Sequence, residues 1–487
     1  MVDYVNKKPK VPENFKLLDG EEVCRVHSFK FTPPKLRQSG LSEIHRLTSS
    51  FDESGVGKNG PVIAALPSEL QPSAYDGQGL YNVVFGRDSL RVAIDLNKHY
   101  PKLTRATLIR LAELQGTKYN TSREEEPGRI PHEIRNATDP IAIKLTKERG
   151  WGWPYYGSVD ATPEFVRTLS AYCKLSNKNV EFLSHEYTDK DGKKQTIANA
   201  LIRAVDWILM HIKNSPDGLV EFKSVLKFGI ENQVWKDSWD SYHHSDGTIA
   251  NHDYGIAPIE VQAVSHDALL NAADLYDTAI INKHDEAKRL RQQAKLLSRK
   301  IIDIFWTEDK GGYFVIGTDR DSGGNLRQLK IRTSNMGHIL NSSVLDSDDK
   351  EINRKKMAIL KQLKSKEMLS ISGVRTLASD EIRFREGAYH NGSVWIWDTY
   401  HIAKGVRRHE KNPEFKDFAN DLESRILNVI NKTGIFPEYV RGGNEIAINT
   451  CTIDVFDHKV NRYNRVEQPP QEVQAWTVAA ILASRWH

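Results

Sequence analysis

The feature that most constrains the fold of this sequence is a long succession of segments with the apolar spacing of α-helices. Apolar residues that recur at every third or fourth position predict a helix with one buried face. Such segments cover 87–98, 102–115, 160–175, 196–214, 258–279, 284–306, 334–343, 351–365, 391–406, 414–431 and 471–485. Strand-like sequence is minor, with hairpin arms at 311–324 and 438–448. Because no sequence repeat with a period of about 20–50 residues accompanies the helices, the pattern predicts a closed all-α toroid of helical hairpins rather than a solenoid.

The domain organisation is predicted from the same pattern. A chain of 487 residues would suit about three average domains, but a large closed barrel can reach this length as one unit. Residues 1–80 are rich in Pro, Gly and Ser and have weak periodicity. We therefore expect 1–80 to form an irregular lead-in packed on the barrel, and 81–487 to form the catalytic barrel.

Charge and hydropathy exclude several classes of partner. The 68 Lys and Arg exceed the 64 Asp and Glu by only four, and no extended basic tract occurs, so nucleic acid is not a predicted partner. No apolar stretch approaches the roughly 20 residues that span a bilayer, and the N-terminus lacks the apolar region of a signal peptide. We expect a cytoplasmic, soluble chain without a membrane partner; its oligomeric state is not indicated. Three distant cysteines predict neither a disulfide framework nor a CxxC metal site.

Tryptophan marks the segments where a ligand is expected. Seven of the ten tryptophans lie in short loop-flanked segments that also carry charged residues: Trp151, Trp153, Trp235, Trp239, Trp395, Trp397 and Trp476. A tryptophan ring offers a flat apolar face with a polar edge, which suits the C–H face of a sugar. Any one of these rings could instead be a core residue, but their clustering beside carboxylates favours a carbohydrate site.

The first candidate for a catalytic carboxyl lies in ENQVWKDSWDSYHHSDG, residues 231–247. Asp237 and Asp240 are three residues apart, so on a helical turn both would project to one face. Mutual repulsion and burial against Trp235 would raise the pKa of one of them above the usual value of about 3.9, as a general acid requires. An ordinary acidic loop is the alternative. The adjacent His243 and His244 have no second cluster at ligand spacing, so no metal site is predicted.

The second candidate carboxyl is Glu438 in TGIFPEYVRGG, where it follows Pro437 between a Gly-containing turn and a strand. This is a rigid way to present a side chain on a loop, although a surface strand would look similar. Only a closed fold could bring Glu438 beside Asp237, because 438 − 237 = 201 positions separate them. Other polar candidates are Arg87 and Asp88 in FGRDSL, Glu260 in PIEVQAV, Arg375 in SGVRTLASDE, and His390 with Trp395 in GAYHNGSVWIWDT.

Ten short motifs in order give the chain a resemblance to a known family. They are FGRDS, GRIPHEIR, YYGSVDATPEFV, NQVWKDSWDS, PIEVQA, SNMGH, GVRTL, YHNGSVWIWD, FPEYVRG and VQAWTVAAIL, and they span roughly residues 80 to 485. The series resembles the catalytic domain of amylo-α-1,6-glucosidase, or glycogen-debranching-enzyme-like, glycoside hydrolases. Wider relatives are glucoamylase, trehalase and the glucosidases that act on glucosylglycerate and mannosylglycerate.

The resemblance implies an (α/α)6 barrel with an active-site pocket at one end of the toroid. It implies Asp237 as the general acid and Glu438 as the general base, with Asp240 left open as an alternative acid. The substrate-binding residues expected with this pair are Arg87, Asp88, Trp235, Lys236, Asp240, Glu260, Arg375, His390 and Trp395. Arg87 and Asp88 would hold the hydroxyls of the released glucose.

The sequence therefore predicts an inverting, exo-acting α-glycosidase, specifically an α-glucosidase for a small α-glucoside or oligosaccharide. An inverting pair stands about 6.5–9.5 Å apart so that water fits between, and this chemistry requires no cofactor. Only about 80 residues precede the barrel, where many debranching relatives carry a β-sandwich-like domain, which favours a small substrate. The alternatives are an amylo-α-1,6-glucosidase for glycogen branch stubs, a sugar epimerase on the same toroid, and a carbohydrate-binding protein without activity.

Overall fold

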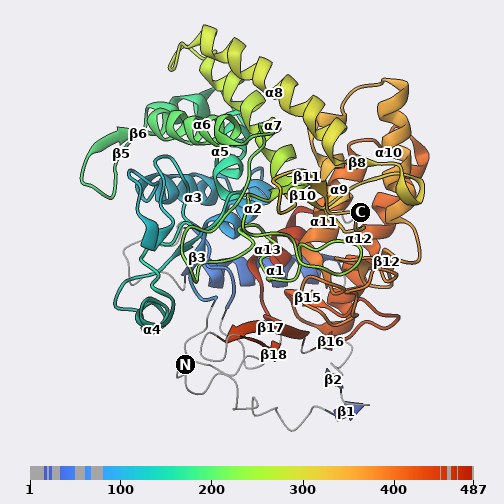
Figure 1. Cartoon of the computed structure of the whole chain (residues 1–487). Helices are drawn as coiled ribbons and strands as arrows, with labels where there is room; N and C mark the ends of the chain where they lie inside the picture. The colour runs from blue at the N-terminus through green and yellow to red at the C-terminus, as the bar shows by residue number, and fades with distance from the viewer. Residues whose placement is uncertain are drawn as a thin grey trace.

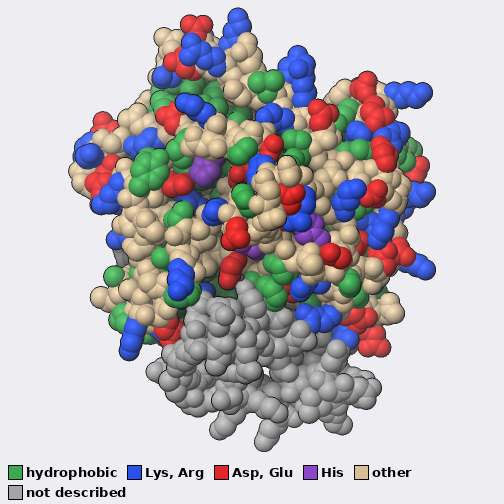
Figure 2. Space-filling view, viewed as in Figure 1, with side chains coloured by type: hydrophobic (Ala, Val, Ile, Leu, Met, Phe, Trp, Pro, Cys, Tyr) green, Lys and Arg blue, Asp and Glu red, His purple; other side chains and the backbone are tan. Residues whose placement is uncertain are grey.

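The structure is a computed structural model that describes residues 16–18, 21–24, 33–49, 61–66, 81–449, 451–457, 462–468 and 470–484. The N-terminal residues 1–15, on which the prediction of no signal peptide depends, lie outside this set, as does much of the predicted lead-in. None of the described helices is long and apolar enough to cross a membrane. On the face drawn in Figure 2, outside the grey residues, acidic and basic side chains are interspersed without a large field of one sign.

Among the described residues, six inner helices close into a ring, which is the frame of an (α/α)6 barrel. They are α2 (Gly86–Leu96), α5 (Ala161–Cys173), α7 (Ile259–Tyr276), α9 (Asn335–His338), α11 (Ile396–Arg407) and α13 (Ala475–Ala483). Each contacts the next in this order, and α13 contacts α2 again. The predicted all-α toroid is thereby confirmed.

A second layer of helices covers the ring, one outer helix on each inner helix (Figure 1). The outer helices are α1 (Pro33–Ser49) on α13, α3 (Pro101–Glu113) on α2, α6 (Ile197–Asn214) on α5, α8 (His284–Phe305) on α7, α10 (Lys350–Leu363) on α9 and α12 (Pro413–Thr433) on α11. The pattern of buried residues differs between the outer and the inner helices. In α8 the buried residues, from Ala287 to Phe305, recur every three or four positions, whereas α13 is buried all round.

Helix α1 is the main departure from the predicted elements, because it lies in the segment expected to be irregular. It buries Leu36, Ile44 and Leu47, which are too widely spaced for the sequence pattern to stand out. Gly40 lies against α13, where an added Cβ would come 3.0 Å from Leu482. The close approach explains a glycine inside this helix, which normally weakens the helical signal.

Most of the strands are two to four residues long, and several directly precede or follow a helix. The pairs that join sequence-distant segments are β3 (Val84–Phe85) with β4 (Glu133–Ile134), β7 (Ala257–Pro258) with β10 (Gly317–Arg320), β14 (Val394–Trp395) with β15 (Tyr439–Val440), and β2 (Glu21–Cys24) with β16 (Ile448–Asn449). The other strands are β1 (Lys16–Leu18), β5 (Glu186–Thr188), β6 (Lys194–Thr196), β8 (Trp306–Thr307), β9 (Tyr313–Phe314), β11 (Leu326–Gln328), β12 (Leu369–Ser370), β13 (Gly373–Val374), β17 (Cys451–Asp457) and β18 (Arg462–Gln468). The hairpin expected at 311–324 is β10 paired with β11, and one further helix, α4 (Pro140–Arg149), lies outside the two layers.

Candidate active site

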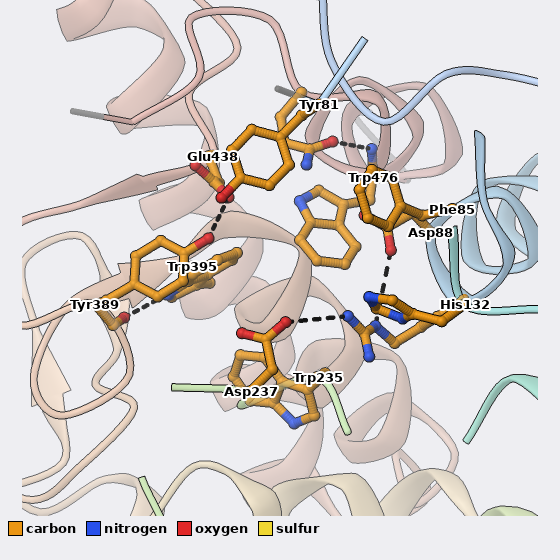
Figure 3. Close-up of a pocket in the computed structure, with 12 residues that line it drawn as sticks. Tyr81, Phe85, Asp88, His132, Trp235, Asp237, Tyr389, Trp395, Glu438 and Trp476 are labelled. Carbon is orange, nitrogen blue, oxygen red and sulfur yellow. Dashed lines mark hydrogen bonds and ion pairs between the residues drawn. The ribbon is translucent and has the colours of Figure 1, made fainter. Parts of the chain in front are cut away.

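A pocket opens where the inner helices begin. Its lining is Tyr81, Phe85, Arg87, Asp88, His132, Trp235, Asp237, Tyr389, Trp395, Glu438, Gln474 and Trp476, around about 350 Å³ of space that is partly open to solvent. The residues on α2 and α13 come from the first turns of these helices, and Trp395 directly precedes α11. The pocket therefore lies at the N-terminal end of the inner ring (Figure 3).

Backbone pairing brings the sequence-distant parts of this lining together. Strand β3 leads into α2 and pairs with β4, so Phe85 lies opposite Glu133 and next to the segment of His132. Strand β14 leads into α11 and pairs with β15, with Trp395 opposite Tyr439, the neighbour of Glu438. The amide of Glu438 also donates to the carbonyl of Gln471 at 3.0 Å, which joins its turn to the start of α13.

Asp237 is one of three carboxyls in the pocket lining, with Asp88 and Glu438. It lies in the long connection between α6 and α7, and its side chain is 33% exposed. The pKa of Asp237 is raised from 3.8 to about 7, because burial disfavours the charged form; the charges of Asp88 and Asp160 add to the shift, and Arg87 opposes it. A carboxyl with such a pKa holds its proton near neutral pH, as a general acid must.

The expectation that Asp237 and Asp240 share one helical face is wrong. Residues 231–240 form turns and bends rather than a helix, so the spacing of three does not align the two side chains. Asp237 points into the pocket, whereas the Asp240 carboxylate lies 3.9 Å from Arg383 and 4.0 Å from Arg385. Asp240 is outside the pocket lining.

Glu438 is another carboxyl of the pocket lining and is only 2% exposed. The Tyr389 hydroxyl donates to its Oε1 at 2.8 Å, and the backbone N–H of Gln471 donates to its Oε2 at 3.3 Å. Burial raises the pKa of Glu438 from 4.5 to about 8, while these two hydrogen bonds oppose the shift. Because both oxygens accept hydrogen bonds, the carboxylate is well oriented as a proton acceptor.

Arg87 and Asp88 are polar residues of the pocket lining. The Nε of Arg87 and the Oδ2 of Asp88 are 3.7 Å apart, and neither atom makes a hydrogen bond within the described part of the chain. Burial raises the pKa of Asp88 to about 6, and Arg87 opposes that shift. A buried donor and a buried acceptor without partners suit a ligand that carries hydroxyl groups.

The other lining residues are mostly aromatic. Trp235 meets Trp395 and Trp397 edge to face, at centroid distances of 5.9 and 4.9 Å, and Trp476 stacks on Trp397 at 4.9 Å. Within the described residues the indole N–H groups of Trp235 and Trp476 are buried without a hydrogen-bond partner. The structure places Trp235 and Trp395 in the pocket lining, and rigid aromatic rings there suit the C–H face of a sugar.

Lys236 and Glu260, two predicted substrate-binding residues, lie behind the pocket wall instead. The Lys236 ammonium donates to the carbonyl of Thr376 at 2.6 Å, and burial lowers its pKa to about 7 although the charges of Asp398 and Glu260 oppose this. Glu260 accepts from Tyr242 at 3.0 Å. Trp235 and Asp237 line the pocket, whereas Lys236 between them does not.

Arg375 and His390 also lie outside the lining. Arg375 donates to backbone carbonyls, among them those of Lys366 at 2.8 Å and Gly442, so its side chain fixes loops. His390 Nδ1 accepts from the amide of Ser238 at 3.3 Å and lies 4.0 Å from Asp237. Burial and the charges of Lys236 and Arg87 keep the pKa of His390 well below its usual value.

Half of the lining lies outside the predicted catalytic and substrate-binding residues: Tyr81, Phe85, His132, Tyr389, Gln474 and Trp476. Of these, Trp476 is among the tryptophans that the sequence indicated near a ligand. All except Tyr81 belong to motifs that carry the family resemblance, such as FGRDS and GRIPHEIR. The motifs therefore contain these residues, but only the strand pairs show that the motifs lie side by side around the pocket. No group of three or more His, Cys, Asp and Glu in the described ranges is arranged to hold a metal ion.

Three comparisons relate the chain to known proteins. The family model described as the mannosylglycerate hydrolase MGH1-like glycoside hydrolase domain matches residues 184–443, which is more than half of the chain. No curated protein sequence matches significantly. The crystal structure of a GH63 mannosylglycerate hydrolase from Thermus thermophilus, in complex with Tris and D-glycerate, superposes with a TM-score of 0.57 at 13% identity, over 92% of this chain and 98% of that one.

A bacterial glucoamylase complexed with acarbose is also similar in fold. Its TM-score is 0.55 at 15% identity, and the match covers 92% of this chain but 54% of the glucoamylase chain. At these identities the two structures support the barrel fold alone. The family match agrees with the wider resemblance seen in the sequence, whereas the narrower resemblance to amylo-α-1,6-glucosidase stays a prediction.

Proposed function

Because the chain belongs to the MGH1-like glycoside hydrolase family, and is a glycoside hydrolase on the six-hairpin barrel, we propose that it is an inverting, exo-acting α-glycosidase for a small α-glycoside. The observation that carries the proposal is the convergence of Asp237 and Glu438 on one pocket with aromatic walls. A pocket, unlike an open groove, accepts the end of a substrate, so one terminal sugar is released at each turnover.

In the proposed reaction Asp237 protonates the glycosidic oxygen while Glu438 removes a proton from a water molecule that attacks from the opposite face of the sugar. The bond from the anomeric carbon to the leaving oxygen breaks, and the bond to the water oxygen forms with inverted configuration. Tyr389 and the Gln471 amide, which hold Glu438, are neutral donors. They orient the carboxylate without removing its affinity for a proton.

Arg87 and Asp88 are proposed to hold hydroxyl groups of the terminal sugar. The unpartnered Arg87 Nε and Asp88 Oδ2 are suited to this role, and the rings of Trp235 and Trp395 would cover the C–H face. Interactions with hydroxyls that strengthen in the transition state raise kcat as well as affinity. We expect no cofactor in this mechanism.

The first substrate class proposed is the small α-glucosides, and the family match favours α-mannosylglycerate as a second candidate. The test is incubation with a panel that contains both, a maltooligosaccharide and a glycogen limit dextrin, with NMR detection of the first anomer released. Release of the β-anomer from a small α-glycoside supports the proposal. Release of the α-anomer contradicts inversion, and a higher kcat/KM on limit dextrin would favour the debranching alternative.

A sugar epimerase and a binding protein without activity are distinguished in the same experiment. An epimerase would convert a free sugar without consuming the glycosides, and a binding protein would leave every substrate intact. Either result contradicts the proposed hydrolysis. The panel therefore separates the reaction classes before any residue is changed.

A further inference from the structure

Asp160 occupies a position where an aspartate normally caps a helix, yet it does not do so. It is the N-cap residue of α5, and its carboxylate accepts no hydrogen bond from the first turn of that helix. Asp139 gives the usual arrangement at the start of α4, where its side chain accepts from the amides of Ile141 and Ala142. The carboxylate of Asp160 therefore does not serve as a helix cap. The motif that contains it, YYGSVDATPEFV, has no role in the site as described so far.

The carboxylate of Asp160 is turned toward the guanidinium of Arg87. Its Oδ2 accepts from Arg87 Nη1 at 3.4 Å, and its Oδ1 accepts from the Ser158 hydroxyl at 2.5 Å. Asp160 is 3% exposed and is not part of the pocket lining. The amide of Val159 donates to the carbonyl of Gln233 at 2.8 Å, so the turn of Asp160 is tied to the segment that carries Asp237.

Three carboxylates thus share one guanidinium. Asp160 is 3.4 Å away, Asp88 3.7 Å and Asp237 3.8 Å, and of these contacts only the one with Asp160 is a hydrogen bond. Figure 3 marks the ion pair that reaches Asp237. If the hold of Asp160 were lost, the guanidinium would be free to approach Asp237, where a closer ion pair would favour the ionised carboxylate.

We propose that Asp160 is a positioning residue that holds the Arg87 guanidinium away from Asp237, so that the acid keeps its proton. This inference rests on the proposed function, in which Asp237 is the general acid. The ionisable groups that face Asp237 are Arg87 and Asp88 from α2, Asp160 from the start of α5, Tyr389 and His390 from the loop before β14, and Glu438 across the pocket.

The sign of the effect follows from these charges. Asp160 raises the pKa of Asp237 and Arg87 lowers it. Substitution of Asp160 by Asn removes one negative charge and weakens the hold on the guanidinium, because an amide oxygen accepts more weakly than a carboxylate, and both changes lower the pKa of Asp237. A charge at this range shifts a neighbouring pKa by about one unit. The protonated fraction of Asp237 is then lower in the variant than in the wild type near and above the new pKa, and the two are equal well below it.

The test combines a titration with kinetics in Asp160→Asn. With [13Cγ]Asp-labelled protein, the titration midpoint of Asp237, assigned by the signal that Asp237→Asn lacks, should move to lower pH. On an α-glycoside with a poor leaving group, kcat/KM should fall on the order of tenfold at pH 7.5 and should equal that of the wild type near pH 5. The rate on the α-glycosyl fluoride, which needs no protonation, should change less than twofold.

Asp139→Asn is the matched control, because it makes the same substitution at a helix start outside the pocket. Its titration and kinetics should match the wild type. If Asp160→Asn does not fold, as checked by circular dichroism, Asp160→Ser also removes the charge and keeps a hydroxyl for Ser158. An unmoved Asp237 midpoint, or an equal loss on both substrates at every pH, overturns the inference. A shifted midpoint in a protein that cleaves no glycoside would instead contradict the proposed function.

Discussion

The two proposed catalytic carboxyls of the pocket, Asp237 and Glu438, are chemically similar but are held in opposite ways. Asp237 stands in a long connection, is 33% exposed and faces the cation Arg87 at 3.8 Å. Glu438 stands on a short turn fixed by strand pairing, is 2% exposed and faces the neutral donors Tyr389 and Gln471. Burial raises both pKa values, to about 7 and about 8. The comparison teaches that a neighbouring charge adjusts the pKa of Asp237, whereas hydrogen bonds fix the orientation of Glu438. Substitutions of these residues and of their neighbours test that contrast.

The largest effect is expected for Glu438→Gln. Without the base the water is not activated, whatever the leaving group, so kcat should fall at least about 1,000-fold on both a poor leaving group and the fluoride. The measurement is the release of sugar, with circular dichroism to confirm the fold. A variant that retains activity on the fluoride would remove Glu438 from the role of base.

Unlike Glu438→Gln, Asp237→Asn should lose activity to an extent that depends on the leaving group. Its loss on a poor leaving group should be about 100- to 10,000-fold, and the fluoride should restore much of the rate because it needs no proton. Asp240→Asn is the matched control, since Asp240 faces Arg383 and Arg385 outside the pocket. If Asp240→Asn shows the leaving-group dependence and Asp237→Asn is mild, the acid is Asp240.

Arg87→Ala and Asp88→Ala should each raise KM and lower kcat, on the order of 100-fold in kcat/KM. Their contacts with hydroxyls are expected to strengthen in the transition state. Steady-state kinetics on the same small glycoside provide the measurement. Wild-type kinetics in either folded variant would show that the residue does not hold the sugar.

A smaller, pH-dependent effect is expected for Tyr389→Phe. Because the two catalytic pKa values are about 7 and 8, the wild-type kcat/KM should peak between these values and fall on both sides, as coupled groups do. Loss of the Tyr389 donor raises the pKa of Glu438 further. The kcat/KM of the variant should then be about tenfold below that of the wild type at pH values under 8, and the ratio of the two should return toward one at higher pH, where Glu438 is ionised in both proteins. Tyr242→Phe, which removes a donor to Glu260, should leave the shape of the profile unchanged.

The smallest effect concerns stability. The pKa of Asp237 in the folded protein, about 7, lies above its ordinary value of 3.8, so the wild type loses stability as pH rises between these values. Asn carries no charge, so Asp237→Asn should unfold a few degrees higher than the wild type at pH 8. The difference should vanish near pH 4. A constant difference in Tm across this range would show that ionisation of Asp237 does not destabilise the fold.

The sequence predicts the barrel better than it predicts the pocket, for a physical reason. Helical periodicity is local, so the inner helices α5 and α7 begin at residues 161 and 259, where the pattern starts at 160 and 258. The exception is α1, whose apolar residues are sparse. Pocket membership depends on strand pairs such as β14 with β15 and on the side of the backbone that a residue occupies. The motifs identified Asp237 and Trp235, but they could not show that Lys236 turns away or that Tyr389 reaches Glu438.

The orientation of the inner helices also has a consequence for how such a protein can diversify. The segments that line the pocket precede the inner helices, while the links at the other end, such as 97–100 and 408–412, contribute no lining residue. The pocket is thereby built from the connections that lead into the inner helices, and the connections that leave these helices lie at the opposite rim of the toroid. Insertions, tags or new termini at 408–412 can be accommodated without disturbing turnover, and changes in substrate preference can accumulate on the pocket rim while the helical frame stays constant.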